Sequence, residues 1–297
     1  MESAERVRVS LAVAALAELR EHEQTLPDGE ARVADLLETA GVFSWPLVVD
    51  AGTGLILDGN HRARVLRRTF GARFAVVQRV ALEAPDVRLE AWVRVLEGVS
   101  STAFERARRD LGLVPDAPTG ALGCRFGGRL YREAAGDGPV GAHRLAIELE
   151  RRLRADGCDV RRRDLAAEEA GPWLSRPGTA VLRLPAVDKA AVRQGAAAGG
   201  LPPKSTRFVF PFRVIGLGVP IDRLRGPRAA VEAALARDRE RPLVCLGGGL
   251  EVDRRYPERL WQFEDHRIPD RLFAGVAGRR AYARALARAA AVPAARP

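Results

Sequence analysis

Apolar residues recur with two different spacings over the first 111 positions of this chain. Short apolar runs bounded by Gly, Pro or Asp predict strands, whereas apolar residues three or four positions apart predict helices. These patterns predict strands over 7–11, 46–49, 54–57 and 74–80, and helices over 31–39, 59–69 and 103–111. Between residues 87 and 95, Val, Leu and Ala alternate with Arg, Glu and Trp. The alternation predicts a half-buried strand, with Trp92 and Arg94 together on the face opposite the apolar one.

The rest of the chain shows the same two spacings. They predict a hairpin over 125–131, strands near 159–160 and over 179–184 and 206–214, and helices over 141–155, 189–198, 228–237 and 279–291. Two prolines fall in the polar stretch 115–119, which is typical of a linker. Because 297 residues suffice for two domains, we expect a boundary there, with domains over residues 1–116 and 120–297.

The net charge of +10 does not by itself indicate a nucleic-acid partner. All basic residues except Lys189 and Lys204 are arginine, a bias typical of a G+C-rich genome, and they are spread along the chain. Aromatic residues make up only 6%, which is poor for stacking on single-stranded bases. No apolar run reaches the roughly 18 residues of a membrane span, and the acidic start does not resemble a signal peptide. We therefore expect a cytoplasmic protein without a membrane partner, and nucleic-acid binding is not the favoured interpretation.

Cysteine and histidine spacing argues against a structural metal or disulfide framework. Cys124, Cys158 and Cys245 are far apart and form no CxxC pair. The four histidines show no HxxxH pairing. His266 follows Glu264 and Asp265, a grouping that suits a metal but more often belongs to a surface loop.

The most informative segment is Asp58-Gly59-Asn60-His61-Arg62. It follows the apolar run 55–57 and opens the predicted helix 59–69. A strand that turns at Asp-Gly directly into a helix leaves backbone N–H groups at the helix start, where the helix dipole favours an anion. His61 and Arg62 add side-chain donors, and an arginine can hold a phosphate through two hydrogen bonds. The segment predicts a phosphate site, with an ordinary basic turn as the alternative.

Two further segments carry candidate chemistry. Lys204, Ser205, Thr206 and Arg207 give four consecutive donors after two prolines, which suits an anionic group; the alternative is a proline turn entering a strand. The segment is not a Walker A loop, because Pro203 precedes the lysine. In Glu21-His22-Glu23, a carboxylate beside a histidine suits a general base, although a solvated helix end is the favoured interpretation of this segment alone.

Together these segments resemble the free L-serine kinases of the ParB/sulfiredoxin-like superfamily, some of which serve siderophore biosynthesis. The resemblance extends to about residue 225, and the matching residues occur in the family's order: His22-Glu23, the Asp-Gly-x-His-Arg box at 58–62, Trp92-x-Arg94, and Pro-Pro-Lys-Ser-Thr-Arg at 202–207. The box is shared across the superfamily, so specificity comes from its combination with residues 202–207. Sulfiredoxins place a reactive cysteine where this chain has Asn60. ParB proteins carry a Gly-Glu-Arg-Arg box followed by a helix-turn-helix.

The resemblance implies an α+β fold with an N-terminal ParB/sulfiredoxin-like domain containing a mixed sheet, and a C-terminal α/β domain that closes the substrate cleft. It implies phosphoryl transfer from ATP or ADP to the hydroxyl of free L-serine, giving O-phospho-L-serine for a biosynthetic pathway. The implied catalytic residues are Glu23 as the base, Asp58 and His61.

Binding roles are implied as well. Asp58 would bind Mg²⁺ or orient the phosphates, and the residues cradling the nucleotide phosphates would be Gly59, Asn60, His61 and Arg62. Trp92 would form a wall of the amino-acid pocket, and the substrate phosphate would be held by Lys204, Ser205, Thr206 and Arg207.

Two alternatives remain beside the serine kinase. Phe208 stands where the family commonly has a histidine. This favours a repurposed member that acts on another hydroxylated amino acid. A ParB-like nucleotide-binding regulator that binds DNA is the other alternative, although the sequence has no evident helix-turn-helix.

Overall fold

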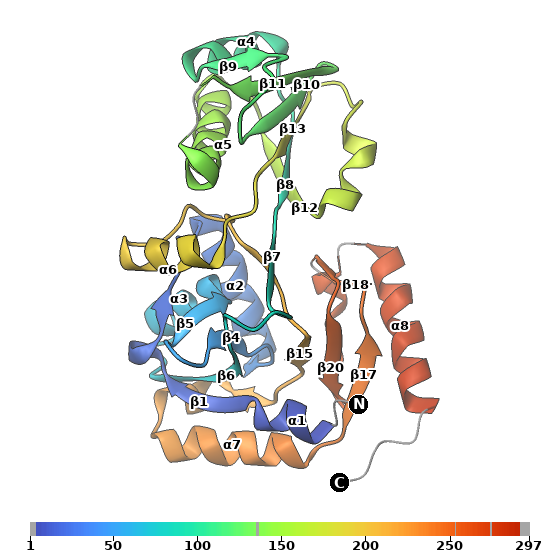
Figure 1. The fold of residues 1–297 in the computed structure, drawn as a ribbon. Helices are drawn as coiled ribbons and strands as arrows, with labels where there is room; N and C mark the ends of the chain where they lie inside the picture. The colour runs from blue at the N-terminus through green and yellow to red at the C-terminus, as the bar shows by residue number, and fades with distance from the viewer. Residues whose placement is uncertain (1–3, 135–136, 253, 274, 292–297) are drawn as a thin grey trace. The chain divides into compact units, whose positions relative to one another are not determined.

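The computed structural model describes residues 4–134, 137–252, 254–273 and 275–291. The chain forms two compact units, and each is described by itself. Unit 1 combines residues 1–88 with residues 208–297, and unit 2 comprises residues 89–207. The chain passes between the units at two short strands, β7 (Arg88–Glu90) and β14 (Arg207–Val209). Unit 2 is therefore an insertion within unit 1 (Figure 1).

These borders differ from the predicted division into residues 1–116 and 120–297. The proline-containing stretch after β9 (Leu113–Pro115) lies inside unit 2. Pro115 pairs with Tyr131 of β11 (Arg129–Glu133), so the same sheet continues on both sides of the stretch. Two prolines mark a loop there, and loops occur within domains as readily as between them.

The first sheet of unit 1 is mixed, as predicted. Its order is β1-β6-β4-β5-β2, and its strands span Leu11–Ala15 (β1), Phe74–Val80 (β6), Leu47–Asp50 (β4), Leu55–Asp58 (β5) and Arg20–Glu21 (β2). β1 and β5 run antiparallel to their neighbours β6 and β4, whereas β4–β6 and β2–β5 are parallel. All of β4 and most of β5 is buried, because this apolar pair lies in the middle of the sheet.

Helices cover this sheet and complete its core. The helices of unit 1 span Ala4–Val9 (α1), Pro27–Ala40 (α2), Asn60–Arg68 (α3), Arg228–Glu240 (α7) and Val276–Ala291 (α8). α7 packs against β1 and β6, and α2 packs against α3, which contacts β4 (Figure 1). Buried apolar residues of α3, the sheet and α7 form one cluster. Residues 208–297 thus supply part of the core that supports the Asp58 segment.

The remaining strands of unit 1 form smaller sheets. They span Val42–Phe43 (β3), Phe212–Ile215 (β15), Val219–Pro220 (β16), Leu243–Gly247 (β17), Leu250–Glu251 (β18), Arg255–Tyr256 (β19) and Arg259–Phe263 (β20). β20 lies between β15, to which it is parallel, and β17, to which it is antiparallel. A separate apolar cluster joins this sheet to α8.

Unit 2 contains a six-stranded sheet in the order β12-β8-β13-β10-β11-β9. The strands not yet bounded span Arg161–Leu165 (β12), Val93–Glu97 (β8), Thr179–Arg183 (β13) and Gly123–Phe126 (β10), and the helices span Ser101–Asp110 (α4), Gly138–Ala155 (α5) and Lys189–Ala197 (α6). One face of the sheet packs with α4 and α5, and the other packs with residues 165–174. β8 is therefore buried on both faces.

Several predicted strands differ from the structure. The strand expected near 159–160 lies just before β12, and the strand expected over 206–214 divides into β14 and β15. The expected strand 7–11 is the end of α1 followed by β1. Val7 is fully buried whereas Val9 is 76% exposed, so two residues that a strand would place on one face lie in different environments. The expected strand 87–95 divides into β7 and β8. Arg94 was predicted beside Trp92 on a polar face, but it is fully buried because helices cover that face as well.

Candidate functional site

The segment from Asp58 to Arg62 forms the predicted corner between a strand and a helix. β5 ends at Asp58, Gly59 has φ +103°, and α3 begins at Asn60. Only glycine adopts this backbone easily. A Cβ on Gly59 would lie 2.7 Å from Leu47 Cδ2 and 3.0 Å from Arg62 Nη2, so the corner has no room for a side chain. The predicted turn is confirmed, and Gly59 is what permits it.

The start of α3 has the features of an anion site. Gly59 caps the helix without a side-chain hydrogen bond, and its carbonyl accepts the first helical bond from Ala63 N–H, at 2.8 Å. There is no acidic residue in the first turn to compete with an anion. The helix dipole and the N–H groups of the first turn therefore favour a negatively charged ligand here.

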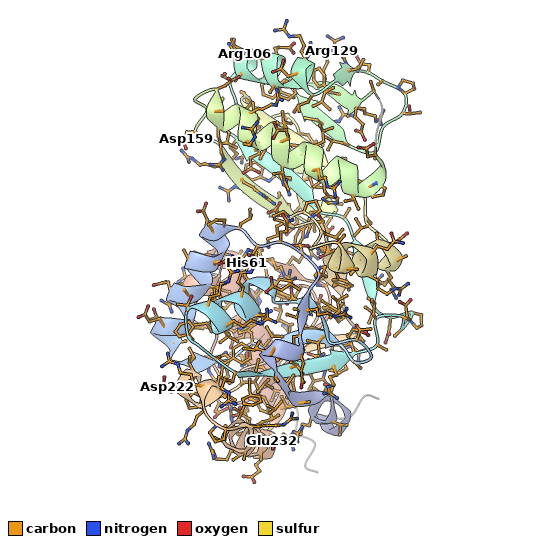
Figure 2. The ribbon with its side chains drawn as sticks, turned by 90° about the vertical axis from the view of Figure 1, so that its left-hand side faces the viewer. His61, Arg106, Arg129, Asp159, Asp222 and Glu232 are labelled. Carbon is orange, nitrogen blue, oxygen red and sulfur yellow. The ribbon has the colours of Figure 1, made fainter. Side chains whose placement is uncertain are left out.

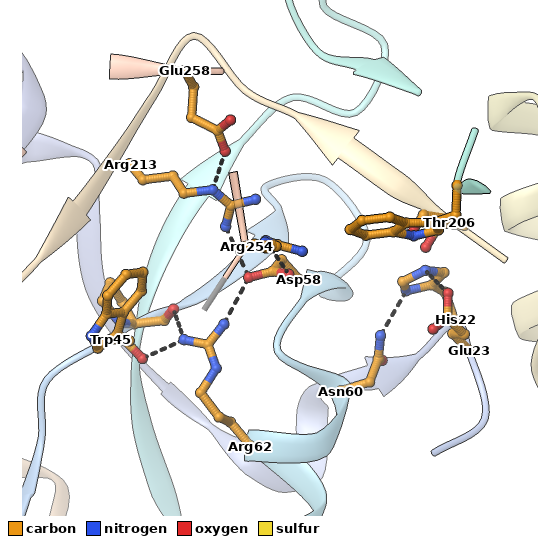
Figure 3. Close-up of polar contacts among 12 residues, drawn as sticks. His22, Glu23, Trp45, Asp58, Asn60, Arg62, Thr206, Arg213, Arg254 and Glu258 are labelled. Carbon is orange, nitrogen blue, oxygen red and sulfur yellow. Dashed lines mark hydrogen bonds and ion pairs between the residues drawn. The ribbon is translucent and has the colours of Figure 1, made fainter. Parts of the chain in front are cut away.

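The carboxylate of Asp58 is surrounded by arginines. Its oxygens lie 2.7 Å from Arg62 Nη2, 2.8 Å from Arg213 Nη1 and 3.2 Å from Arg254 Nη2 (Figure 3). Burial alone would raise the pKa of Asp58, but the attraction of Arg213, Arg254 and Arg62 outweighs it and holds the pKa well below its usual value. A divalent cation bound to this carboxylate would meet three positive charges. The arrangement suits an anchor for arginines and does not fit a Mg²⁺ ligand.

Arg62 and Arg213 make further buried contacts within this group. Arg62 Nη1 donates to the carbonyls of Trp45 and Pro46, at 2.7 and 2.9 Å. Arg213 Nε donates to Glu258, and both of these side chains are almost completely buried. The guanidinium of Arg62 is thus hydrogen-bonded to groups of unit 1. We call Asp58, Arg62, Arg213, Arg254 and Glu258 the Asp58 cluster.

His61, predicted as a donor to phosphate, serves here as an acceptor. Leu26 N–H donates to His61 Nε2 at 3.0 Å, which leaves the ring proton of the neutral imidazole on Nδ1. Gly29 in α2 makes this approach possible, because a Cβ there would lie 2.5 Å from the same nitrogen. His61 therefore fastens α3 to the start of α2 (Figure 2).

Asn60 has a buried side-chain amide whose hydrogen-bonding groups are only partly paired. The side chain is 7% exposed, Nδ2 lies 3.2 Å from His22 Nδ1, and Oδ1 has no hydrogen-bond partner among the described residues (Figure 3). His22 Nδ1 also lies 2.5 Å from the carbonyl oxygen of Ile56, so it must carry the proton and donate. Turning the amide would bring Oδ1 toward this donor and leave the NH₂ group unpaired. In either orientation, one end of the amide still needs a partner at the start of α3.

Glu21, His22 and Glu23 do not form the solvated helix end that their sequence favours. Glu21 ends β2 and pairs with Arg64 and Arg67 of α3. His22 is 1% exposed and Glu23 is 7% exposed. His22 Nε2 lies 3.8 Å from Glu23 Oε2, beyond a hydrogen bond but close enough to shape the surroundings of that carboxylate. The pair is buried in unit 1, one strand away from the Asp58 corner.

Phe208, at a position where the resemblance leads us to expect a histidine, contacts His22. Its ring meets the His22 ring edge-on at 5.7 Å, and it stacks with Phe210 at 5.7 Å. An aromatic ring with no hydrogen-bonding group therefore occupies a place beside His22.

Within unit 2, the structure brings the predicted substrate residues together around Trp92. The indole Nε1 donates to the carbonyl of Thr206 at 2.7 Å. Lys204 Nζ and the Arg207 guanidinium lie 5.7 and 5.4 Å from the indole ring centre, within the range of cation–π attraction. Arg207 also pairs with Glu90.

Ser205 and Lys204 shape the backbone of this loop. Ser205 is fully buried and donates to the carbonyl of Pro202 at 2.6 Å, so its hydroxyl closes the turn. Lys204 has φ +59°, a conformation that is unfavourable for a residue with a Cβ. Strain of this kind is often retained at functional sites.

Local sequence gave no indication of Arg213, Arg254 or Glu258. They lie 155 to 200 positions after Asp58 and carry no motif, so only the fold reveals them. The alternation over residues 87–95 includes Arg94 but does not predict its burial.

The described residues contain no group of three or more His, Cys, Asp or Glu side chains arranged to hold a metal ion. His266 lies in the loop after β20, where burial, with a further contribution from Arg241, lowers its pKa to about 4. Within the same described ranges, no helix has the length and apolar character needed to cross a bilayer.

Some of the exposed arginines pair with nearby carboxylates. In unit 2, exposed Arg106 and Arg129 lie within 3.1 and 3.4 Å of Asp156 and Asp116 (Figure 2).

Solved structures resemble this chain, although no family model and no curated protein sequence matches it. SbnI with a C-terminal truncation, from Staphylococcus aureus, is 16% identical, has a TM-score of 0.64, and the match covers 78% of this chain and 98% of SbnI. A glutamate-to-alanine variant of a free serine kinase in complex with ADP is 20% identical, has a TM-score of 0.60, and the match covers 72% of this chain and 94% of the kinase.

This chain has the fold of the free serine kinases. A conserved hypothetical protein from Pyrococcus furiosus also resembles this chain: it is 20% identical, has a TM-score of 0.58, and the match covers 72% of this chain and 97% of that protein. The predicted α+β class and the predicted resemblance are thus confirmed at the level of the fold.

Proposed function

We propose that this chain is a kinase that transfers a phosphoryl group from ATP or ADP to the hydroxyl of free L-serine. The observation that carries the proposal is the start of α3, where Asn60 keeps a buried, unpaired amide end beside an uncapped helix N-terminus. With the amide turned so that Oδ1 accepts from His22 Nδ1, its NH₂ group would donate to a phosphate oxygen, as would the backbone N–H groups of the first turn. Solved kinases of the same fold hold ADP or AMP, which supports a nucleotide as the source of that phosphate.

The reaction needs a base for the incoming hydroxyl. We assign this role to Glu23, whose burial beside His22 protects it from bulk water. The serine oxygen attacks the terminal phosphorus of the nucleotide, and the bond from that phosphorus to the bridging oxygen breaks. The hydroxyl proton passes to the Glu23 carboxylate, and the shortened nucleotide leaves with the electron pair.

Unit 1 supplies the nucleotide-binding groups in this proposal. Asn60 and the first turn of α3 contact the phosphates, while Asp58 and Arg62 hold the corner in shape. His61 acts by fastening α3 to α2, so we regard it as a positioning residue. Asp58 carries no Mg²⁺ in this scheme, and any Mg²⁺ that accompanies the nucleotide would need other ligands.

Unit 2 supplies the acceptor-binding groups. Trp92 provides a flat apolar wall, and the ammonium of Lys204 beside it attracts the transferred phosphoryl group. Ser205, Thr206 and Arg207 maintain this loop through the contacts described above. Because Phe208 replaces a histidine beside His22, we include other hydroxylated amino acids among the acceptors to be tested.

Phosphorus NMR tests the proposal directly. Purified protein is incubated with L-serine and Mg²⁺, with either ATP or ADP as donor, and L-threonine, L-homoserine and D-serine serve as alternative acceptors. A new phosphomonoester signal that requires L-serine supports the kinase. Nucleotide binding without a phosphomonoester from any acceptor would overturn it and favour a nucleotide-binding regulator.

A further inference from the structure

Arg94 is the largest fully buried side chain among the described residues, and its charge is only partly matched. It lies in β8, between β12 and β13 of the unit 2 sheet. Its Nε donates to Asp164 Oδ1 at 3.3 Å. Both terminal nitrogens, Nη1 and Nη2, are buried and have no hydrogen-bond partner within the described part of the chain. These two nitrogens bear four N–H groups, all of which lack an acceptor within the described part of the chain.

The surroundings of Arg94 do not supply the missing acceptor. Asp164 is shared with Arg162, whose Nε and Nη2 lie 3.0 and 3.1 Å from its oxygens. Glu150 of α5 lies 3.4 Å from Arg162 Nη1 and also pairs with Arg154. Burial, and then repulsion from Arg162, lower the pKa of Arg94. Both nearby carboxylates are therefore already engaged by other arginines.

A buried guanidinium with unpaired N–H groups is costly, and removing the cost requires an oxygen-rich partner. The two terminal nitrogens form a planar fork that matches the two oxygens of a carboxylate. We propose that Arg94 binds the α-carboxylate of the amino-acid acceptor in unit 2. The inference rests on the proposed function in naming an amino acid as the ligand.

The position of Arg94 fits this role. Trp92 lies two residues earlier on the same face, and pairing continues to it because Leu184 N–H donates to the Trp92 carbonyl at 3.4 Å. Lys204 lies near Trp92 and is close enough to Asp164 to help lower the pKa of that carboxyl, after Arg162 and Arg94. Arg94, Trp92 and Lys204 thus gather at one end of β8.

Each of these three side chains could contact a different part of the acceptor. Arg94 would hold the carboxylate, Trp92 would contact the carbon skeleton, and Lys204 would attract the phosphoryl group. Because Arg94 is closed to solvent, entry of the ligand requires residues around it in unit 2 to move.

Calorimetry with matched ligands tests the inference. L-serine and L-alanine both have the α-carboxylate, whereas 2-amino-1,3-propanediol replaces that carboxylate with a hydroxymethyl group. We expect the wild-type protein to bind L-serine about 100-fold more tightly than the diol, the ratio that an arginine–carboxylate pair commonly supplies. Equal affinities in the wild-type protein would overturn the inference without the need for any variant.

Variants of Arg94 then test whether this residue causes the preference for L-serine over the diol. In Arg94→Gln the serine-to-diol ratio should fall to less than about 5, and Arg94→Lys should be intermediate because lysine lacks the planar fork. Arg163→Gln is the matched control: Arg163 lies in neighbouring β12, is 52% exposed, and pairs with Glu97. It should keep the wild-type ratio. An unchanged ratio in folded Arg94→Gln would assign Arg94 a structural role only.

L-alanine separates this inference from the kinase proposal, since it has the carboxylate but no hydroxyl. Arg94-dependent binding of L-alanine without phosphorylation of serine would retain the carboxylate site and reject the kinase. Serine phosphorylation together with a serine-to-diol ratio that does not depend on Arg94 would retain the kinase and reject the carboxylate site.

Discussion

Arg213 donates to the carboxylate of Asp58 at 2.8 Å, although the two residues are separated by 155 positions in the chain. This contact joins the Asp58 corner to β15 and so connects the first part of unit 1 to the part that follows the insertion. The site that sequence placed in residues 58–62 therefore depends on residues beyond 208.

Replacing Asp58 should change how stability depends on pH. The pKa of Asp58 is lower in the folded than in the unfolded protein, so its contribution is fully present above about pH 4 and is lost as pH falls through the folded pKa. Asp58→Asn should lower the free energy of unfolding at pH 7 by about 3 kcal/mol or more, because Arg213 remains buried without this partner. The difference in melting temperature between wild type and variant should shrink as the pH falls below about 4.

Asp222→Asn is the control for that series, because its side chain is 90% exposed and its ion pair with Arg225 contributes little. Its melting temperature should follow the wild-type value at every pH. A constant gap between wild type and Asp58→Asn across the acid range would contradict a lowered pKa for Asp58.

Asn60→Asp should weaken nucleotide binding. The substitution keeps the size of the side chain but places a negative charge at the start of α3, where the phosphates are proposed to lie. We expect the Kd for ADP, measured by calorimetry at pH 8, to rise at least about tenfold, since like charges in a partly buried site repel strongly. Asn60→Ala, which removes the amide without adding charge, should cause a smaller rise. Equal ADP affinity in all three proteins would remove Asn60 from the nucleotide site.

Glu23→Gln should abolish most of the kinase activity. Loss of a general base typically costs about 100-fold or more in kcat, whereas the KM for the nucleotide should change little. Glu21→Gln separates this effect from folding, because Glu21 pairs with Arg64 and Arg67 and has a structural role. That control should melt at a lower temperature and retain its kcat. If Glu23→Gln turns over serine at the wild-type rate, Glu23 is not the base.

Lys204 allows strain and charge to be measured separately. Lys204→Gly removes the ammonium and relieves the left-handed backbone, whereas Lys204→Ala removes the ammonium and keeps the strain. Both variants should lose phosphoryl transfer to a similar extent. The glycine variant should be more stable than the alanine variant by about 1 kcal/mol in chemical denaturation. Equal stabilities would show that this backbone stores no strain.

The sequence by itself determined the local features of this protein. A short apolar run determines β6, and the Asp-Gly step after another apolar run determines the corner at Gly59, because these structures depend on residues adjacent in the chain. The four motifs together were also enough to identify the fold. Arg62 shows the limit of such reasoning: a basic residue at a helix start suggests a phosphate ligand, yet this arginine binds Asp58 and two carbonyls of its own chain.

Only the tertiary structure decided what those residues contact. The division at residues 88 and 208 follows from long-range pairing and packing, which no proline-rich stretch reveals. Long-range packing also brings the arginines to Asp58 and leaves the charge of Arg94 unmatched. Local sequence determines where the backbone turns, but burial and charge pairing arise between segments that are far apart in the chain. These contacts decide whether a charged side chain stabilises the fold or is available to a ligand.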